Sequence, residues 1–95
     1  MNRAEVISKI RNLTGIQEED VKVVVETFLH IIQQALMAGE EVHIKGFGKF
    51  FNKKRSSKIA RNLSSNTALL IGAHYIPMLK LSKDFVNKIK KTIST

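Results

Sequence analysis

The stretch "EEVHIKGFGKFFNKKR" (residues 40–55) carries the strongest structural signal in the chain. Val42 and Ile44 alternate with polar residues, which is the two-residue period of a half-buried strand. Two glycines flank Phe47 and predict a tight turn, after which Phe50 resumes the apolar pattern. The stretch therefore predicts two strands joined by a turn at residues 46–48, and the second strand runs into a basic segment.

Two helices are predicted before this hairpin. Asn2, followed three residues later by Glu5, has the form of a capping box at a helix N-terminus, and Gly15 supplies a stop. A second helix is predicted to begin in the acidic run at 18–20, which suits the positive end of the helix dipole, and to end at Gly39. Its apolar stripe is wider than a single short helix covers, so we expect the chain to dimerise.

The segment after the hairpin is predicted to leave the core and return. Residues 52–66 are nearly devoid of large apolar side chains, whereas residues 68–80 regain them and predict one strand, with Gly72 and Pro77 at bulge or edge positions. Ser82 is a predicted N-cap for a last helix at 83–93. The predicted fold class is α+β: two N-terminal helices, a three-stranded antiparallel sheet with a long protruding β-ribbon arm, and a C-terminal helix.

All 95 residues are predicted to form one domain. Its expected parts are a helical dimerisation base (1–40), the sheet with the arm at about 52–72 (41–81), and the C-terminal helix (82–95). The sequence has no cysteine, no signal-peptide pattern and no apolar run near the ~20 residues of a membrane span. We therefore expect no disulfide, no membrane partner and a cytoplasmic location.

Charge is distributed unevenly along the chain. The formal net charge is +8, yet residues 1–40 sum to −2 and residues 41–95 to +10. This asymmetry predicts a polyanionic partner for the C-terminal half. His30, His43 and His74 are isolated from one another, and no catalytic constellation is present, so we expect no metal site, cofactor, small-molecule substrate or enzymatic activity.

Three motifs resemble the bacterial HU and integration host factor family of DNA-binding proteins. They are "GFGKF" (46–50), "ARN" (60–62) and "IPMLKLSKDF" (76–85). The resemblance implies an intertwined dimer, either a homodimer or a heterodimer with a paralogue. The helices then form its base and the sheets a saddle, and the two arms embrace double-stranded DNA in the minor groove.

The arm tip departs from the family pattern at one informative position. Members carry, directly after the Arg-Asn pair, a proline that wedges between base pairs, and Leu63 stands there in this chain. Apolar wedges kink the duplex at an unstacking cost of about a few kcal/mol per step, a mode of binding for which this family is a standard example. Leu63 is accordingly the predicted intercalating residue. The alternative, that Leu63 packs against the arm itself, remains open.

The remaining site residues follow from charge and from the resemblance. Asn62 is expected to hydrogen-bond minor-groove base edges, and Asn66 either does the same or only shapes the turn. The predicted DNA-binding residues are Arg3, Gly46, Lys53, Lys54, Arg55, Lys58, Arg61, Asn62, Leu63, Asn66, Lys80 and Lys83. The predicted dimer-interface residues are Phe28, Ile32, Phe47 and Phe50.

The predicted function is that of a histone-like, nucleoid-associated architectural protein that binds, bends and compacts duplex DNA with little sequence specificity. A site-preferring factor like integration host factor, acting in recombination or transcription, is the alternative within the family. A basic RNA-associated protein is the alternative outside it. The arm contains no aromatic residue on which RNA bases could stack, which disfavours that last alternative.

Overall fold

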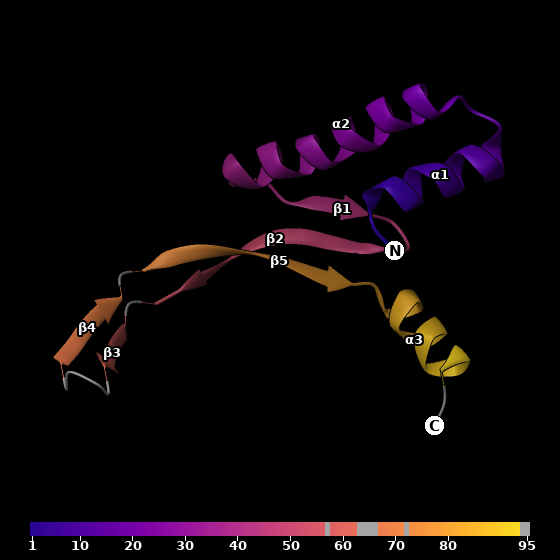
Figure 1. Cartoon of the computed structure of the whole chain (residues 1–95). Helices are drawn as coiled ribbons and strands as arrows, with labels where there is room; N and C mark the ends of the chain where they lie inside the picture. The colour runs from indigo at the N-terminus through magenta and orange to yellow at the C-terminus, as the bar shows by residue number, and fades with distance from the viewer. Residues whose placement is uncertain (57, 63–66, 72, 94–95) are drawn as a thin grey trace. The chain divides into compact units, whose positions relative to one another are not determined.

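The computed structural model describes residues 1–56, 58–62, 67–71 and 73–93, and within 58–62 and 67–71 it describes the backbone. This part of the chain contains three helices and five strands (Figure 1). It divides into two compact units, Met1–Ala35 and Leu36–Thr95. The functional division at residues 40 and 81 stays a prediction.

Both N-terminal helices form where the sequence predicts them. Helix α1 (Arg3–Thr14) is capped by Asn2, whose Oδ1 accepts a hydrogen bond from the Glu5 amide at 2.9 Å, and it ends against Gly15. Helix α2 (Glu18–Met37) begins with the three acidic residues of its first turn. Among the described residues, the apolar side chains buried to below a tenth exposure are Ile7, Val21 and Ile32.

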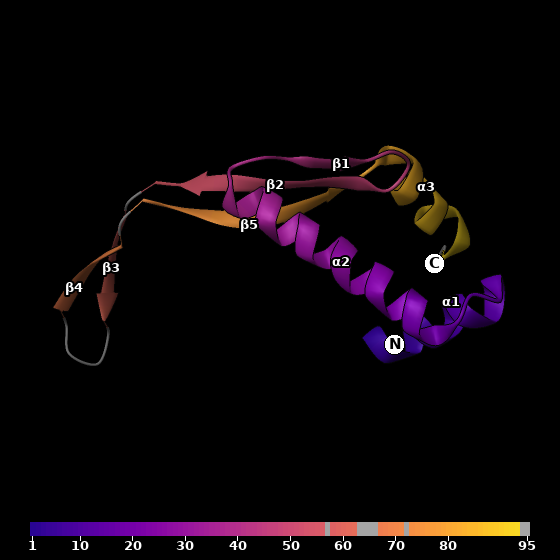
Figure 2. The same cartoon turned by 90° about the horizontal axis from the view of Figure 1, so that it is seen from above.

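The second unit is built on a three-stranded antiparallel sheet, as predicted. Strands β1 (Val42–Ile44), β2 (Gly48–Arg55) and β5 (His74–Leu81) lie in the order β1-β2-β5 (Figure 2). The β1–β2 turn holds Gly46 at φ 78°, a conformation that glycine adopts without steric cost. Phe47 then packs against Phe50 and Phe85, with ring centroids 6.4 and 5.5 Å apart.

The arm is a separate two-stranded antiparallel ladder, β3 (Lys58–Asn62) with β4 (Thr67–Ile71). Its pairs run from Lys58 opposite Ile71 to Asn62 opposite Thr67. The single strand predicted at 68–80 is therefore wrong, because β4 ends at Ile71 and β5 begins at His74. A glycine within a strand pattern weakens the ladder, and Gly72, which carries that signal, lies outside the described residues. Pro77 lies on β5, an edge strand, where its missing N–H is tolerated.

The C-terminal helix α3 (Lys83–Thr92) starts at the predicted cap. The Ser82 hydroxyl accepts a hydrogen bond from the Phe85 amide at 3.2 Å, and the helix ends one residue before the predicted position 93. The Ser82 amide also donates to the Phe47 carbonyl at 2.8 Å. This bond ties the start of α3 to the β1–β2 turn, so both are held at one end of the sheet.

Candidate nucleic-acid interface

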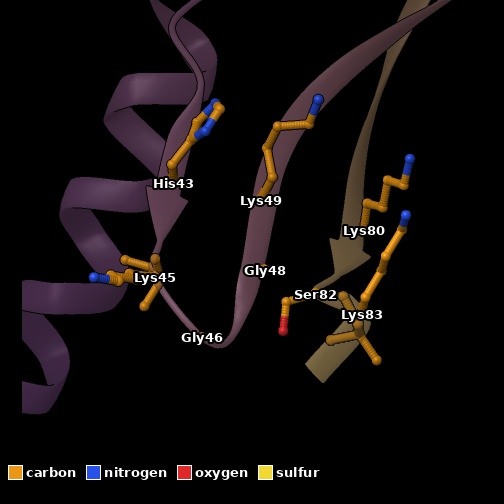
Figure 3. A pocket seen from close by; sticks show the side chains of 10 residues that line it. His43, Lys45, Gly46, Gly48, Lys49, Lys80, Ser82 and Lys83 are labelled. Carbon is orange, nitrogen blue, oxygen red and sulfur yellow. The ribbon is translucent and has the colours of Figure 1, made fainter. Parts of the chain in front are cut away.

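A shallow open groove of about 440 Å³ lies at the end of the sheet where the β1–β2 turn meets the start of α3. Its lining is basic: it contains the four lysines 45, 49, 80 and 83 together with His43, and no acidic residue. Figure 3 shows the amino groups of Lys49, Lys80 and Lys83 extending in the same general direction from β2, β5 and α3. An anion entering the groove therefore meets cations from three elements.

Three of these side chains form a cross-strand row, by which we mean His43, Lys49 and Lys80. His43 is opposite Lys49 in the β1–β2 register, and Lys49 is opposite Lys80 in the β2–β5 register. Directly opposed residues of an antiparallel pair share one face, and like charges placed so are mutually destabilising. No described residue forms an ion pair with either lysine. The row therefore favours a bound anion that offsets the repulsion.

The helix terminus adds backbone donors to the same groove. The first N–H groups of a helix lack intrahelical partners and carry the positive end of its dipole, so they attract phosphate. Lys83 is the first residue of α3, and Ser82 caps it. Gly46 and Gly48 of the β1–β2 turn also line the groove. The predicted residues Gly46, Lys80 and Lys83 are thus brought together by the fold.

The sheet continues into the basic ribbon. Lys53, Lys54 and Arg55 occupy the end of β2, and all three are exposed. Because they are consecutive, they alternate between the two faces of the strand. Lys58, Arg61 and Asn62 follow on the backbone of β3. The wedge candidate Leu63 and Asn66 lie outside the described residues.

Arg3 belongs to the other compact unit. Its guanidinium lies 3.8 Å from the Glu26 carboxylate, and both side chains are exposed. An exposed pair at this distance is worth about 0–1 kcal/mol. Arg3 thus stays a candidate through its charge alone.

The groove lining contains one histidine and two lysines that were not predicted as site residues: His43, Lys45 and Lys49. The sequence contains a signal for two of them, His43 and Lys49. His43 alternates with half-buried Val42 and Ile44, and a turn centred on Gly46 places position 49 opposite position 43. The strand period and the turn position together would have located both on one face.

The pKa of the Glu41 carboxyl is lowered from its usual value. The main cause is the hydrogen bond with the His43 ring, 2.9 Å from Nε2 to Oε1. Desolvation opposes this lowering, and the charges of Lys49 and His43 add to it. Glu41 therefore stays a carboxylate through the neutral and mildly acidic range. It is a fixed negative charge beside the row.

The described residues show neither a metal centre nor a membrane span. Nowhere among them do three or more His, Asp or Glu side chains gather closely enough to hold a metal ion. None of the helices within the same residues has the length and apolar character needed to cross a membrane.

Comparison with known proteins identifies the family. Residues 1–90 match the family model described as bacterial DNA-binding protein. The DNA-binding protein HU of Thermotoga maritima is 31% identical over 90 residues, covering 95% of this chain and all of the relative. Integration host factor subunit beta of Stutzerimonas stutzeri is 28% identical, covering 94% of this chain and 97% of the relative. An Anabaena HU–DNA cocrystal structure matches with a TM-score of 0.87 at 26% identity, over 94% of this chain and 97% of that one. The chain therefore belongs to the bacterial DNA-binding protein family.

Proposed function

We propose that this chain is a histone-like architectural protein that binds duplex DNA through its basic sheet face and arm. The observation that carries the proposal is the pair of lysines in the cross-strand row on the sheet. No described acidic residue forms an ion pair with either of them, and the row leads into the basic end of β2. The similarity to a chain whose cocrystal structure contains DNA supports it. Duplex DNA is the polyanion that such a surface suits.

The phosphate contacts supply most of the affinity. Each Lys or Arg that neutralises a phosphate releases condensed counterions, so binding weakens steeply as salt increases. In this proposal Lys80, Lys83 and the Gly46 turn hold the duplex on the sheet. The arm contacts the duplex beyond the sheet. Its basic residues follow the DNA backbone into the minor groove, where negative potential is concentrated; they are Lys53, Lys54, Arg55, Lys58 and Arg61.

Sequence specificity is expected to be low. Asn62 and Asn66 are the polar uncharged candidates for base-edge contacts, and the minor groove distinguishes little beyond A·T from G·C. Leu63 acts as the apolar wedge that opens a base step and kinks the duplex. A site-preferring role like that of integration host factor remains the alternative, and it would require selection through DNA deformability.

Dimerisation completes the proposed architecture. The described part of one chain buries only three apolar side chains below a tenth exposure, while Val24, Phe28 and Ile31 on α2 are 68%, 46% and 56% exposed. Burying such a surface favours a second copy. Of the predicted interface residues on α2, Phe28 exposes apolar area that a second copy could cover, whereas Ile32 is only 7% exposed in a single chain. We propose a homodimer, with a paralogous partner as the alternative. We further propose that it acts on the cytoplasmic nucleoid without catalytic activity.

The salt dependence of duplex binding tests this function. We expect wild-type affinity to fall steeply between 0.05 and 0.2 M salt. For Arg61→Ala, the slope of log K against log[salt] should be about one unit shallower for each arm. Lys22→Ala, on the acidic N-terminal half, is the matched control and should keep the wild-type slope. A wild type that does not bind duplex DNA, or an Arg61→Ala slope equal to that of Lys22→Ala, would contradict the proposal.

A further inference from the structure

The cross-strand row contains one imidazole beside its two lysines. His43 stands opposite Lys49, and Lys80 follows on the next strand. The His43 side chain is 66% exposed, so it does not hold the core together. An unperturbed imidazole titrates within the range from pH 5 to 8, where lysine does not. Among the three residues of the row, histidine is therefore the residue type whose charge can respond to pH in this range.

The contact with Glu41 decides which ring nitrogen gains the proton when the ring becomes charged. Glu41 Oε1 lies 2.9 Å from Nε2, and a carboxylate only accepts hydrogen bonds, so Nε2 carries the hydrogen. In the neutral ring Nδ1 is then a lone-pair acceptor, which repels phosphate oxygens. Protonation places a hydrogen on Nδ1 and turns it into a charged donor. The ring thus changes from an anion-repelling group to an anion-binding group, and it keeps its hydrogen bond to Glu41.

The charges around His43 set the sign of the effect. On its own side of the hairpin are Glu41 and Lys45; β2 contributes Lys49, β5 contributes Lys80 and α3 contributes Lys83. Glu41 places a negative charge beside the ring, and the lysines place positive charges around it. A phosphate on the row would offset the lysines, so binding an anion and taking up a proton promote each other. Glu41 and the row's two lysines sum to a formal charge of +1, which becomes +2 when His43 is protonated.

We propose that protonated His43 is a further phosphate-binding group of the sheet face, so that the protein holds the DNA backbone more tightly in mildly acidic solution. The inference rests on the proposed function and adds to it a regulation by pH. It also assigns Lys49, between His43 and Lys80, to the same phosphate contact. The phosphates concerned are those of duplex DNA, because a run of them spaced along a strand can engage a row that crosses three strands.

Fluorescence anisotropy with a labelled duplex at pH 5.5 and pH 7.5, at a fixed 0.15 M salt, tests the inference. One added contact per chain should tighten wild-type binding by about fivefold per chain at the lower pH. His43→Gln should lack this gain, because glutamine does not titrate. His30→Gln, exposed on α2 and outside the groove, is the matched control and should keep it. Thermal melts at both pH values would verify that the variants are folded.

The outcomes separate the two proposals. A gain that is lost only in His43→Gln supports the assignment. A gain of equal size in wild type and His43→Gln, or no gain in wild type, overturns the inference and leaves the DNA-binding function standing. Absence of wild-type binding at both pH values overturns both. Free inorganic phosphate at the same ionic strength should compete only weakly at either pH value. Strong competition at pH 5.5 alone would show a site for the free anion in place of the DNA backbone.

Discussion

At the scale of single residues, Gly48 limits how the sheet is assembled. A Cβ at this position would lie 2.6 Å from the Lys80 carbonyl oxygen and 3.1 Å from the Leu81 Cα. Both neighbours are backbone atoms of β5, so a side chain at 48 is accommodated only if β2 and β5 move apart. That movement would displace Lys80 and the start of α3, both of which line the groove.

We therefore expect Gly48→Ala to lower the free energy of unfolding by about 1–3 kcal/mol, the usual cost of overpacking. Gly46 is the matched comparison, because a Cβ there meets nothing within 4 Å and only its φ of 78° opposes a side chain. Asparagine tolerates that conformation, so Gly46→Asn should be milder than Gly46→Ala, whereas Gly48→Asn should not be milder than Gly48→Ala. Urea unfolding measures all four variants. A Gly48→Ala protein as stable as wild type would show that the strands are not held this closely.

The residue scale also shows what the sequence predicts well. The caps at Asn2 and Ser82 were predicted because a cap depends on a few neighbouring residues. Lys49 was missed as a site residue because its role depends on its cross-strand neighbours His43 and Lys80, which are distant in sequence. Contacts within a few residues follow from local chemistry, whereas those across strands require the register.

At the scale of elements, the helices and the three-stranded sheet follow the sequence patterns, whereas the strand boundaries around the ribbon do not. The apolar run at 68–80 predicts a single strand, but β4 and β5 belong to separate ladders. Periodicity reports which residues suit a strand. It does not report where the hydrogen-bonded ladder is interrupted, because that depends on both paired segments: β2 also ends, at Arg55, before β3 begins at Lys58.

The prediction at this scale is that the chain dimerises through helix α2. Val24, Phe28 and Ile31 are spaced four and three residues apart, so they form one exposed apolar stripe. If this stripe is buried in a dimer, the melting temperature should rise with protein concentration, and Phe28→Asp should weaken association. Lys22→Asp lies on the opposite side of the helix and should associate like wild type. Sedimentation equilibrium measures association, and a wild type that stays monomeric at high micromolar concentration would contradict the dimer.

At the scale of the whole molecule, the function depends on adding many modest contacts. Smoothly bending 20–30 base pairs by 40–90° costs on the order of 1–6 kcal/mol. Phosphate contacts on the sheet face and along the arms are the proposed compensation, and Leu63 is the proposed origin of the kink. The family, and hence the arm and its wedge position, was recognisable from sequence motifs. The leucine at that position is where this chain departs from them, so the kink needs a direct measurement.

That measurement is the end-to-end distance of a short duplex labelled with a fluorescence donor and acceptor, titrated with wild type and Leu63→Ala. We predict that wild type brings the ends together, and that Leu63→Ala binds with a similar salt dependence but a much smaller change in distance. Leu63→Pro, which restores the residue common at this position in the family, should bend at least as strongly as wild type. If wild type binds without shortening the distance, or Leu63→Ala bends the duplex equally, Leu63 is not the wedge and the account of bending is contradicted.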